Sequence, residues 1–423
     1  MKEITLNHIT KIEGHAKLTL KIDKSRVIIC ELGATEGARY FEGLVMGRHY
    51  YEAHEMTSRI CGICSCAHVV CAIQGMEDAL GVIPSAQTVE LRKLLTLGER
   101  IRSHATHLYF LALPDYVGYE SALAMAKEFK PELKRALHMM KVGNHIIKTL
   151  AARDLHPVSA TVGGWLKLPR NAQLKELHAQ VESLREDAVA TVELFSGLSY
   201  PDFESKGESF SLSEAKEYAM LSGSLISGEH HFDKDHYLGF IREYHHDYSS
   251  ANFVVRDDHR YMVGALPRMN NNGQQLCDAA KSILKKTRFK LPSSNPYHNV
   301  MAQAIELVHC IDHAVDILKN LTIQDEKLVA ITPKVGRGVG VIEVPRGTLW
   351  HEYQLDKKGI IRKANIITPT AQNLLNIQED IREFVPTILK KSKKDMIMDI
   401  EKLIRSYDPC FSCSAHFLEV NWR

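Results

Sequence analysis

The sequence lacks an uninterrupted apolar run of about 18 residues, which argues against a membrane-spanning helix. It also has little net charge: 53 Lys and Arg against 51 Asp and Glu leave +2, too small a field to hold nucleic acid or anionic lipid. The first residues alternate apolar and polar side chains, so we expect no signal peptide there. Repeats, low-complexity tracts and Gly/Ser linkers are missing too, which predicts a single body over residues 1–423.

Cysteine is also scarce. Nine cysteines in 423 residues are an odd number and do not resemble the disulfide framework of a small secreted protein. A reducing compartment, and hence a cytoplasmic location, fits this usage better. Four of the nine form two Cys-x-x-Cys pairs, and a histidine follows each pair. The pairs are Cys61 with Cys64, followed by His68, and Cys410 with Cys413, followed by His416.

Hydrophobic periodicity divides the chain into regions. We expect an N-terminal sheet region (1–60, with strands within 3–33), a helical bundle (85–330), a strand region (331–370), C-terminal helices with metal ligands (371–416) and a short tail (417–423). Apolar spacing predicts helices over 86–112, 120–153, 171–197, 296–322 and 371–406, and irregular structure over 198–270. The predicted fold class is mainly α with small β-sheets (α+β). Its core is a long-helix bundle, and its metal site is built from both chain ends.

The two Cys-x-x-Cys pairs point to a metal. Two thiolates separated by two residues can turn toward one point, and soft thiolates select zinc, copper(I), nickel or iron over hard cations. Zinc ribbons keep their pairs within about 15–20 residues, whereas 345 residues separate Cys64 from Cys410. Structural zinc, a thiol redox pair and a buried catalytic metal all remain compatible with the spacing. Any shared site must be assembled by the whole fold.

The sequence around the cysteines resembles a known family. Arg-Ile-Cys-Gly-Ile-Cys at 59–64 with His68, and Asp-Pro-Cys at 408–410 with Cys413 and His416, are similar to the two signatures of the nickel-iron hydrogenase large subunit. Further matching blocks follow in the expected order at 11–15, 41–42, 343–347 and 368–370. The likeness spans nearly the full chain and is greatest to the cytoplasmic cofactor-linked group that includes sulfhydrogenase alpha subunits.

The resemblance implies a ligand set. Cys61, Cys64, Cys410 and Cys413 would bind nickel, and Cys64 and Cys413 would also bridge to an iron that carries carbon monoxide and cyanide. No iron-sulfur cluster or flavin is expected in this chain, because it has neither a four-cysteine cluster spacing nor a Gly-x-Gly-x-x-Gly fingerprint. Glu42 and His416 would help to bind Mg²⁺, although a helix-start carboxylate is an equally good interpretation of Glu42 from the residues alone.

The same resemblance assigns roles in catalysis. The Cys410 thiolate would accept a proton that Glu13 relays, and the Arg346 guanidinium would lie over the open metal position. Without the family, Glu13 is an ordinary turn residue or ion-pair partner, and Arg346 is a surface charge in a tight turn. Residues expected to surround and orient the ligands are His68, Pro345, Thr370 and Asp408.

These residues imply an oxidoreductase that acts on hydrogen. The chain would be the catalytic subunit of a cytoplasmic hydrogenase, cleaving H₂ reversibly and heterolytically. Its electrons would pass to an iron-sulfur small subunit and then to flavin- and NAD(P)-binding subunits or another soluble acceptor. Maturation proteins would insert the metals, and an endopeptidase would remove residues 417–423. The alternatives are a hydrogen-sensing subunit and a non-catalytic scaffold with four-cysteine zinc.

Overall fold

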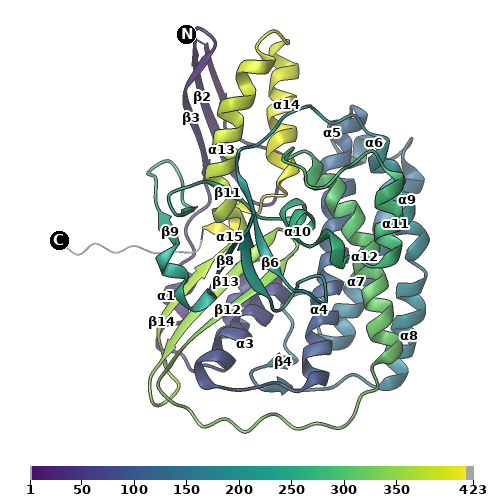
Figure 1. The fold of residues 1–423 in the computed structure, drawn as a ribbon, viewed down its shortest axis with the longest axis vertical. Coiled ribbons are helices and arrows are strands. Elements are labelled where there is room, and N and C mark those ends of the chain that lie inside the picture. Colours follow the sequence, from purple (N-terminus) through teal and green to yellow (C-terminus); the bar gives the residue numbers. More distant parts are fainter. Residues whose placement is uncertain (1, 416–423) are drawn as a thin grey trace, which may run out of the picture.

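The structure is a computed structural model that describes residues 2–415, and its elements are shown in Figure 1. The chain opens with an antiparallel sheet in the order β1-β2-β3. Its strands are β1 (Lys2–Leu6), β2 (Ala16–Asp23) and β3 (Arg26–Ala34). Every second residue of β2 is buried, as expected for a strand with one face on a core. This sheet, which the sequence predicted, packs against α13 (Pro369–Ile388) from the other end of the chain.

Short helices connect this sheet to the first cysteine pair. They are α1 (Phe41–Val45), α2 (Ala53–Thr57) and the 3₁₀ turn η1 (Ser58–Ile60). After Cys64 the chain enters α3 (Ser65–Leu80), which the sequence analysis did not predict. Fourteen of its 16 residues are buried, so α3 has no polar face and no amphipathic period. The helix ends at Gly81, whose φ of 68° is the left-handed conformation of a helix C-terminus.

Long helices form the bundle seen on one side of the molecule in Figure 1. They are α4 (Ala86–Thr106), α7 (Lys130–Ala151), α8 (Asn171–Glu182), α9 (Arg185–Ser196) and α12 (His298–Asn320), with the shorter α5 (Leu113–Val117), α6 (Ala122–Met125) and α11 (Asp278–Lys286). The predicted bundle is confirmed, but the helix expected over 171–197 is two helices, and α4 continues into a π-helical stretch, His107–Ala112. α4 and α7 approach closely because Gly98 and Gly143 face each other.

The segment expected to be irregular, 198–270, contains strands, so that expectation is wrong. β6 (Glu208–Ser213), β7 (Ser224–Ser227), β8 (His230–Phe232) and β11 (Tyr261–Met262) form a sheet in the order β11-β6-β7-β8, and β9 (Ile241–Tyr244) pairs with β10 (Phe253–Arg256). The strands are only two to six residues long, and β6 and β7 are rich in serine, so no clear period of two is visible in the sequence. Next comes α10 (Ala265–Asn272), and another short pair, β4 (Ala160–Thr161) with β5 (Gly164–Trp165), lies between α7 and α8.

The C-terminal part of the chain returns to the middle of the molecule. β12 (Gly336–Val344), β13 (Gly347–Leu355) and β14 (Ile361–Ile367) lie in the expected strand region, where they form an antiparallel sheet, and β12 lies directly on α3. The helical tail is interrupted at 389–392, giving α13 and α14 (Lys393–Ser406), before the short α15 (Phe411–Ser414). Figure 1 shows α15 at the centre of the fold, between the N-terminal sheet and β12–β14.

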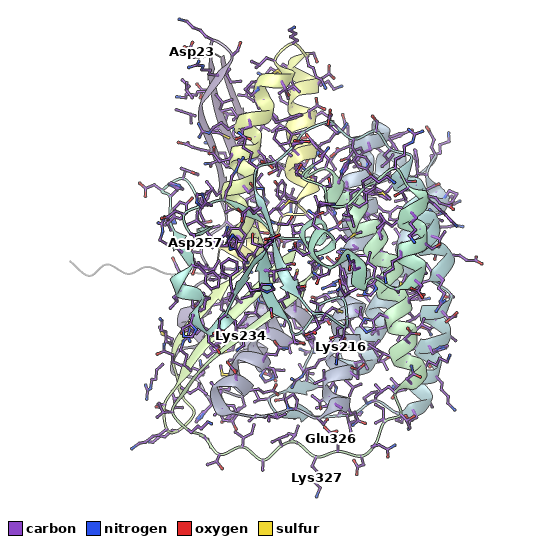
Figure 2. All side chains as sticks on the ribbon, viewed as in Figure 1. Asp23, Lys216, Lys234, Asp257, Glu326 and Lys327 are labelled. Atoms are coloured by element: carbon purple, nitrogen blue, oxygen red, sulfur yellow. A yellow bond between two sulfur atoms is a disulfide. The ribbon has the colours of Figure 1, made fainter. Side chains whose placement is uncertain are left out.

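Charged side chains project from the outside of this arrangement. Glu326 and Lys327 lie on the extended segment that joins α12 to β12 along the edge of the molecule in Figure 2. Glu326 anchors that segment by accepting hydrogen bonds from Ser85 and Thr88 at the start of α4. Among residues 2–415, no helix is long and apolar enough to cross a membrane. The mainly α class with small sheets is confirmed.

Candidate metal centre

The fold brings the two cysteine pairs together. Cys61 follows η1 and Cys64 immediately precedes α3, whereas Cys410 and Cys413 lie at α15. The sulfurs of Cys61 and Cys410 are 3.6 Å apart, and those of Cys61, Cys64 and Cys413 all lie within 4.8 Å of one another. Cys410 and Cys413 form a disulfide, which must be reduced before both can bind a metal as thiolates. None of the four residues is more than 4% exposed.

Two contacts hold the cysteine segments in place. Glu13, in the connection between β1 and β2, forms an isolated parallel β-bridge with Cys410, and its carbonyl accepts a hydrogen bond of 2.9 Å from the amide of Phe411. The Arg39 guanidinium donates to the carbonyl of Ile60 at 2.6 Å and also to the carbonyl of Ser412. Arg39 therefore links the segment before Cys61 to the segment between Cys410 and Cys413. The sequence analysis missed Arg39, because no local pattern marks such a long-range contact.

The donor set fits a soft metal. Four sulfurs at one buried point, with the Glu13 carboxylate beside them, match a metal that prefers thiolate and not one that prefers oxygen. A hydrogen bond from Cys64 lowers the pKa of the Cys61 thiol and raises that of Cys64, and the nearby Arg346 charge favours the thiolate of both. A small cavity adjoins the sulfurs and is lined by Cys64, His68, Val344, Arg346, Leu349, Pro369, Thr370, Cys410 and Cys413. The residues present thus fit a nickel-iron centre.

Arg346 is not a surface charge. It lies in the two-residue turn between β12 and β13 and is 4% exposed. Its Nη1 donates to the sulfur of Cys64 at 2.9 Å, its Nε donates to the carbonyl of Asp408 at 2.8 Å, and its Nη2 is 3.1 Å from an Asp408 carboxylate oxygen. Burial alone would lower the pKa of Arg346, but the charges of Asp408 and the cysteines raise it, so the guanidinium stays charged.

Glu13 lies next to the second cysteine pair. Its Oε2 is 2.7 Å from the sulfur of Cys410, close enough to accept the thiol proton of Cys410 once the disulfide is reduced. The hydroxyl of Ser412 donates to both Glu13 carboxylate oxygens, at 2.9 and 2.8 Å, and lies 3.4 Å from a carboxylate oxygen of Glu36. These contacts link Cys410 to a second carboxylate. The sequence analysis missed Ser412, although its position between the two cysteines was a usable signal.

The other residues expected around the ligands are also near them. Thr370 accepts a hydrogen bond of 2.8 Å from the amide of Cys410, and Asp408 accepts one of 3.0 Å from Gln303. Pro345 precedes Arg346 in the turn. His68 lines the cavity, and its Nδ1 is 3.1 Å from Nε2 of His351, a partner that lies 283 positions away and that the sequence did not indicate.

The magnesium prediction involves one described residue. Glu42 lies in the first turn of α1 and accepts a hydrogen bond of 2.7 Å from the amide of Ile366; its burial raises the pKa of Glu42 to about 7. His416 lies outside the described residues. Within residues 2–415, every close group of three or more potential ligands contains cysteines of the two pairs, and none includes the histidines of the 230–259 segment.

Comparison with known proteins identifies the family. A family model described as nickel-dependent hydrogenase matches residues 39–153 and 257–416, about two thirds of the chain and all four cysteines. The chain belongs to the nickel-dependent hydrogenase family. The alpha subunit of sulfhydrogenase 1 from Pyrococcus furiosus is 33% identical over 428 residues, covering 99% of this chain and 98% of that protein. The beta subunit of the NAD-reducing hydrogenase HoxS from Cupriavidus necator is 28% identical, covering 99% and 95%.

Solved structures of nickel-iron enzymes share the fold of this hydrogenase chain. An NAD⁺-reducing [NiFe]-hydrogenase in the H₂-reduced state has a TM-score of 0.90 at 24% identity and covers 98% of this chain and 100% of that one. A [NiFeSe]-hydrogenase from Dm. baculatum has a TM-score of 0.80 at 20% identity with the same coverage. The predicted function is therefore confirmed at the level of the family: this is the catalytic large subunit of a nickel-iron hydrogenase, an oxidoreductase acting on hydrogen, and the zinc scaffold is not favoured.

Proposed function

We propose that Cys61, Cys64, Cys410 and Cys413 would hold the nickel of this hydrogenase, and that Cys64 and Cys413 would also hold the iron. The observation that carries the proposal is the convergence of two distant cysteine pairs at one buried point beside a fixed guanidinium and a carboxylate. When bound, such a centre supplies an open coordination position at which H₂ is polarised for heterolytic cleavage. The apolar cavity walls Val344, Leu349 and Pro369 suit an iron that carries carbon monoxide and cyanide.

Side chains of the protein then transfer the proton and stabilise the negative charge that develops during cleavage. The Cys410 thiolate accepts the proton and Glu13 takes it over a distance of 2.7 Å, with the Ser412 hydroxyl steadying the carboxylate. Arg346 places a permanent positive charge beside the Cys64 sulfur, where it stabilises negative charge during cleavage. The Thr370 hydroxyl accepts a hydrogen bond from the Cys410 amide, and its own proton is available to donate a hydrogen bond to a cyanide on the iron.

Magnesium, partners and location complete the proposal. A buried carboxylate such as Glu42 suits a hard cation, and Glu42 with His416 is the magnesium pair that we propose. Both relatives described above are named as subunits, which supports an iron-sulfur small subunit here, and the NAD-reducing relative supports a flavin- and NAD(P)-linked electron path in the cytoplasm. We propose that residues 1–423 form a single body into which maturation proteins insert the metals. An endopeptidase would then remove residues 417–423.

The proposal is tested by metal content, infrared spectra and the variant Arg346→Lys in the purified complex. We expect one nickel and one iron for each chain, with infrared bands from carbon monoxide and cyanide. Arg346→Lys keeps the charge but loses the planar guanidinium that reaches both Cys64 and Asp408. The hydrogen/deuterium exchange that the enzyme catalyses between hydrogen gas and water should therefore fall while the metals remain bound. Zinc in place of nickel, or wild-type exchange in Arg346→Lys, would contradict the proposal.

A further inference from the structure

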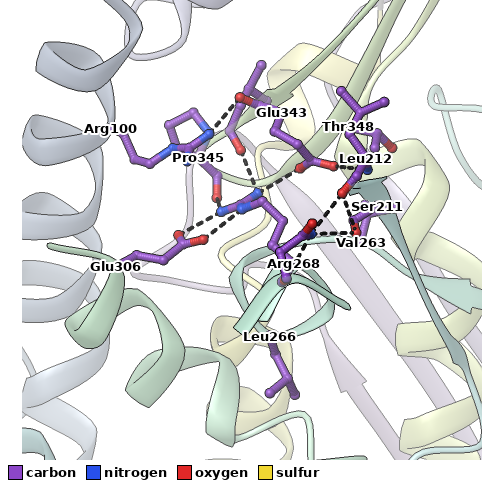
Figure 3. Close-up of polar contacts among 12 residues, drawn as sticks. Arg100, Ser211, Leu212, Val263, Leu266, Arg268, Glu306, Glu343, Pro345 and Thr348 are labelled. Carbon is purple, nitrogen blue, oxygen red and sulfur yellow. Dashed lines mark hydrogen bonds and ion pairs between the residues drawn. The ribbon is translucent and has the colours of Figure 1, made fainter. Parts of the chain in front are cut away.

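A buried cluster of charged side chains lies beside the turn that carries Arg346 (Figure 3). Its centre is Arg268 of α10, which is 0% exposed. Nε and Nη2 of Arg268 donate to the two carboxylate oxygens of Glu306 at 2.7 and 2.8 Å, and Nη1 donates to Glu343 at 3.1 Å. The proposed function assigns none of these three residues a task.

Arg268 also binds the main chain of the turn. Its Nη1 donates to the carbonyl of Val344 at 2.8 Å and its Nη2 donates to the carbonyl of Pro345 at 3.0 Å. Arg100, which is also buried, donates to the carbonyl of Glu343 at 2.7 Å. Two guanidiniums therefore bind the three consecutive carbonyls that precede Arg346. Figure 3 shows Arg100 and Arg268 beside Glu343 and Pro345. A buried carbonyl left without a donor costs about 1–3 kcal/mol, so these contacts strongly restrict the path of the turn.

The partners of Arg268 are themselves fixed. His104 Nε2 lies 2.7 Å from one oxygen of Glu306, and the Tyr218 hydroxyl donates to the other at 2.5 Å. Burial alone would raise the pKa of Glu306, but the charge and hydrogen bonds of Arg268 hold it well below its usual range, so the ion pair is fully charged. A planar guanidinium can bind a carboxylate on one edge and two carbonyls on others, which a lysine ammonium cannot reproduce.

We propose that Arg268 is a positioning residue for Arg346. By fixing the carbonyls of Val344 and Pro345, it sets the place of the Arg346 guanidinium relative to the sulfur of Cys64, 2.9 Å away. This inference rests on the proposed function, which gives Arg346 its task at the metal. It differs from a purely structural ion pair in its consequence: disturbing Arg268 changes the metal site specifically through Arg346. A misplacement of about 1 Å at a catalytic group can cost about 10²-fold in rate.

The test compares Arg268→Lys with a matched control in the purified, nickel-loaded complex. Arg92 is also buried and forms a bidentate ion pair with Glu77, with both distances 2.7 Å; within residues 2–415 its only other hydrogen bond is to the carbonyl of Thr161, so none reaches the turn or the cysteines. Arg268→Lys should keep its nickel, lower hydrogen/deuterium exchange by about tenfold or more, and shift the nickel electron paramagnetic resonance signal as Arg346→Lys does. Arg92→Lys should change neither. Wild-type exchange in Arg268→Lys, or equal losses in both variants, would overturn the inference.

A double variant separates this inference from the proposed function. If Arg268 acts through Arg346, adding Arg268→Lys to Arg346→Lys should lower exchange by less than about twofold, whereas multiplied losses would show an independent effect. Wild-type exchange in Arg346→Lys instead refutes the proposed role of Arg346 itself. If Arg268→Lys does not load nickel, Arg268→Met with Glu306→Met removes the ion pair without leaving one charge buried. If that double variant exchanges at the wild-type rate or fails to fold, the Arg268–Glu306 pair has only a structural role, and the inference is overturned.

Discussion

Three glycines of β12 let this strand lie against the backbone of α3. A Cβ atom on Gly340 would lie 2.3 Å from the carbonyl oxygen of Cys71 and 2.8 Å from the amide nitrogen of Gly75. A Cβ atom on Gly338 would be 2.2 Å from backbone atoms of Gly75 and Ala79. Any side chain at these positions would push the strand away from the helix. The contact therefore sets the separation between α3 and β12.

This separation matters for the metal centre, because α3 begins after Cys64 and β12 ends just before the turn that carries Arg346. In Gly340→Ala, the new contact is about 1 Å shorter than van der Waals distance, so strand and helix must move apart by about that amount. Overpacking of this kind costs about 1–3 kcal/mol in the free energy of unfolding. The 2.9 Å contact from Arg346 to the Cys64 sulfur lengthens as well, and hydrogen/deuterium exchange should fall by about 10²-fold.

The assay measures exchange for each bound nickel, together with thermal unfolding, in the purified complex. Gly239→Ala is the matched control, because a Cβ atom there meets nothing within 4 Å. It should leave both the exchange rate and the unfolding temperature of the complex unchanged. If Gly340→Ala unfolds at a lower temperature but exchanges at the wild-type rate, the strand–helix contact supports the fold without positioning Arg346, and the reasoning is refuted.

Three further predictions concern the proton path, the ligands and pH. Glu13→Gln should keep nickel but lower exchange, because an amide cannot take the Cys410 proton across 2.7 Å; unchanged exchange removes Glu13 from the path. Cys61→Ser should lose nickel, whereas Cys30→Ser, equally buried, should keep it, and equal nickel contents would exclude Cys61 as a ligand. Burial raises the pKa of Asp380 from 3.8 to about 6, so its stabilising contribution is complete below pH 3.8 and is lost as pH rises through 6. Chemical denaturation should show wild type losing up to about 3 kcal/mol relative to Asp380→Asn over that range, and parallel pH profiles would be inconsistent with the shift.

Local patterns carried most of what the sequence could predict. The cysteine pairs and the helices α4, α7 and α12 are visible from spacing alone, because each depends on residues a few positions apart. α3 was missed for the opposite reason: it is buried on nearly every side and shows no amphipathic period. The strands within 198–270 escaped prediction because pairing across a sheet, not the local pattern, makes such short segments extended.

The side chains that organise the site were less accessible to sequence reasoning. Arg39 contacts Ser412 across 373 positions, and Arg268 contacts Pro345 across 77. An arginine in a sequence is most often a solvated charge. Only the fold shows that Arg268 is buried, that Arg39 is partly buried, and that both donate to main-chain carbonyls. Arg346 illustrates the same limit, because the turn alone indicated a surface residue and the resemblance to a family was needed to predict its place.

The account rests on one metal held by sulfurs from both ends of the chain. Nickel X-ray absorption of the loaded complex tests this most directly, because it reports the atoms bound to the metal. We predict a nickel surrounded mainly by sulfur with iron as its near neighbour, and a loss of sulfur neighbours when Cys61 or Cys410 is replaced by serine. A nickel bound mainly by nitrogen and oxygen, or one whose spectrum is unchanged by both substitutions, would contradict the account.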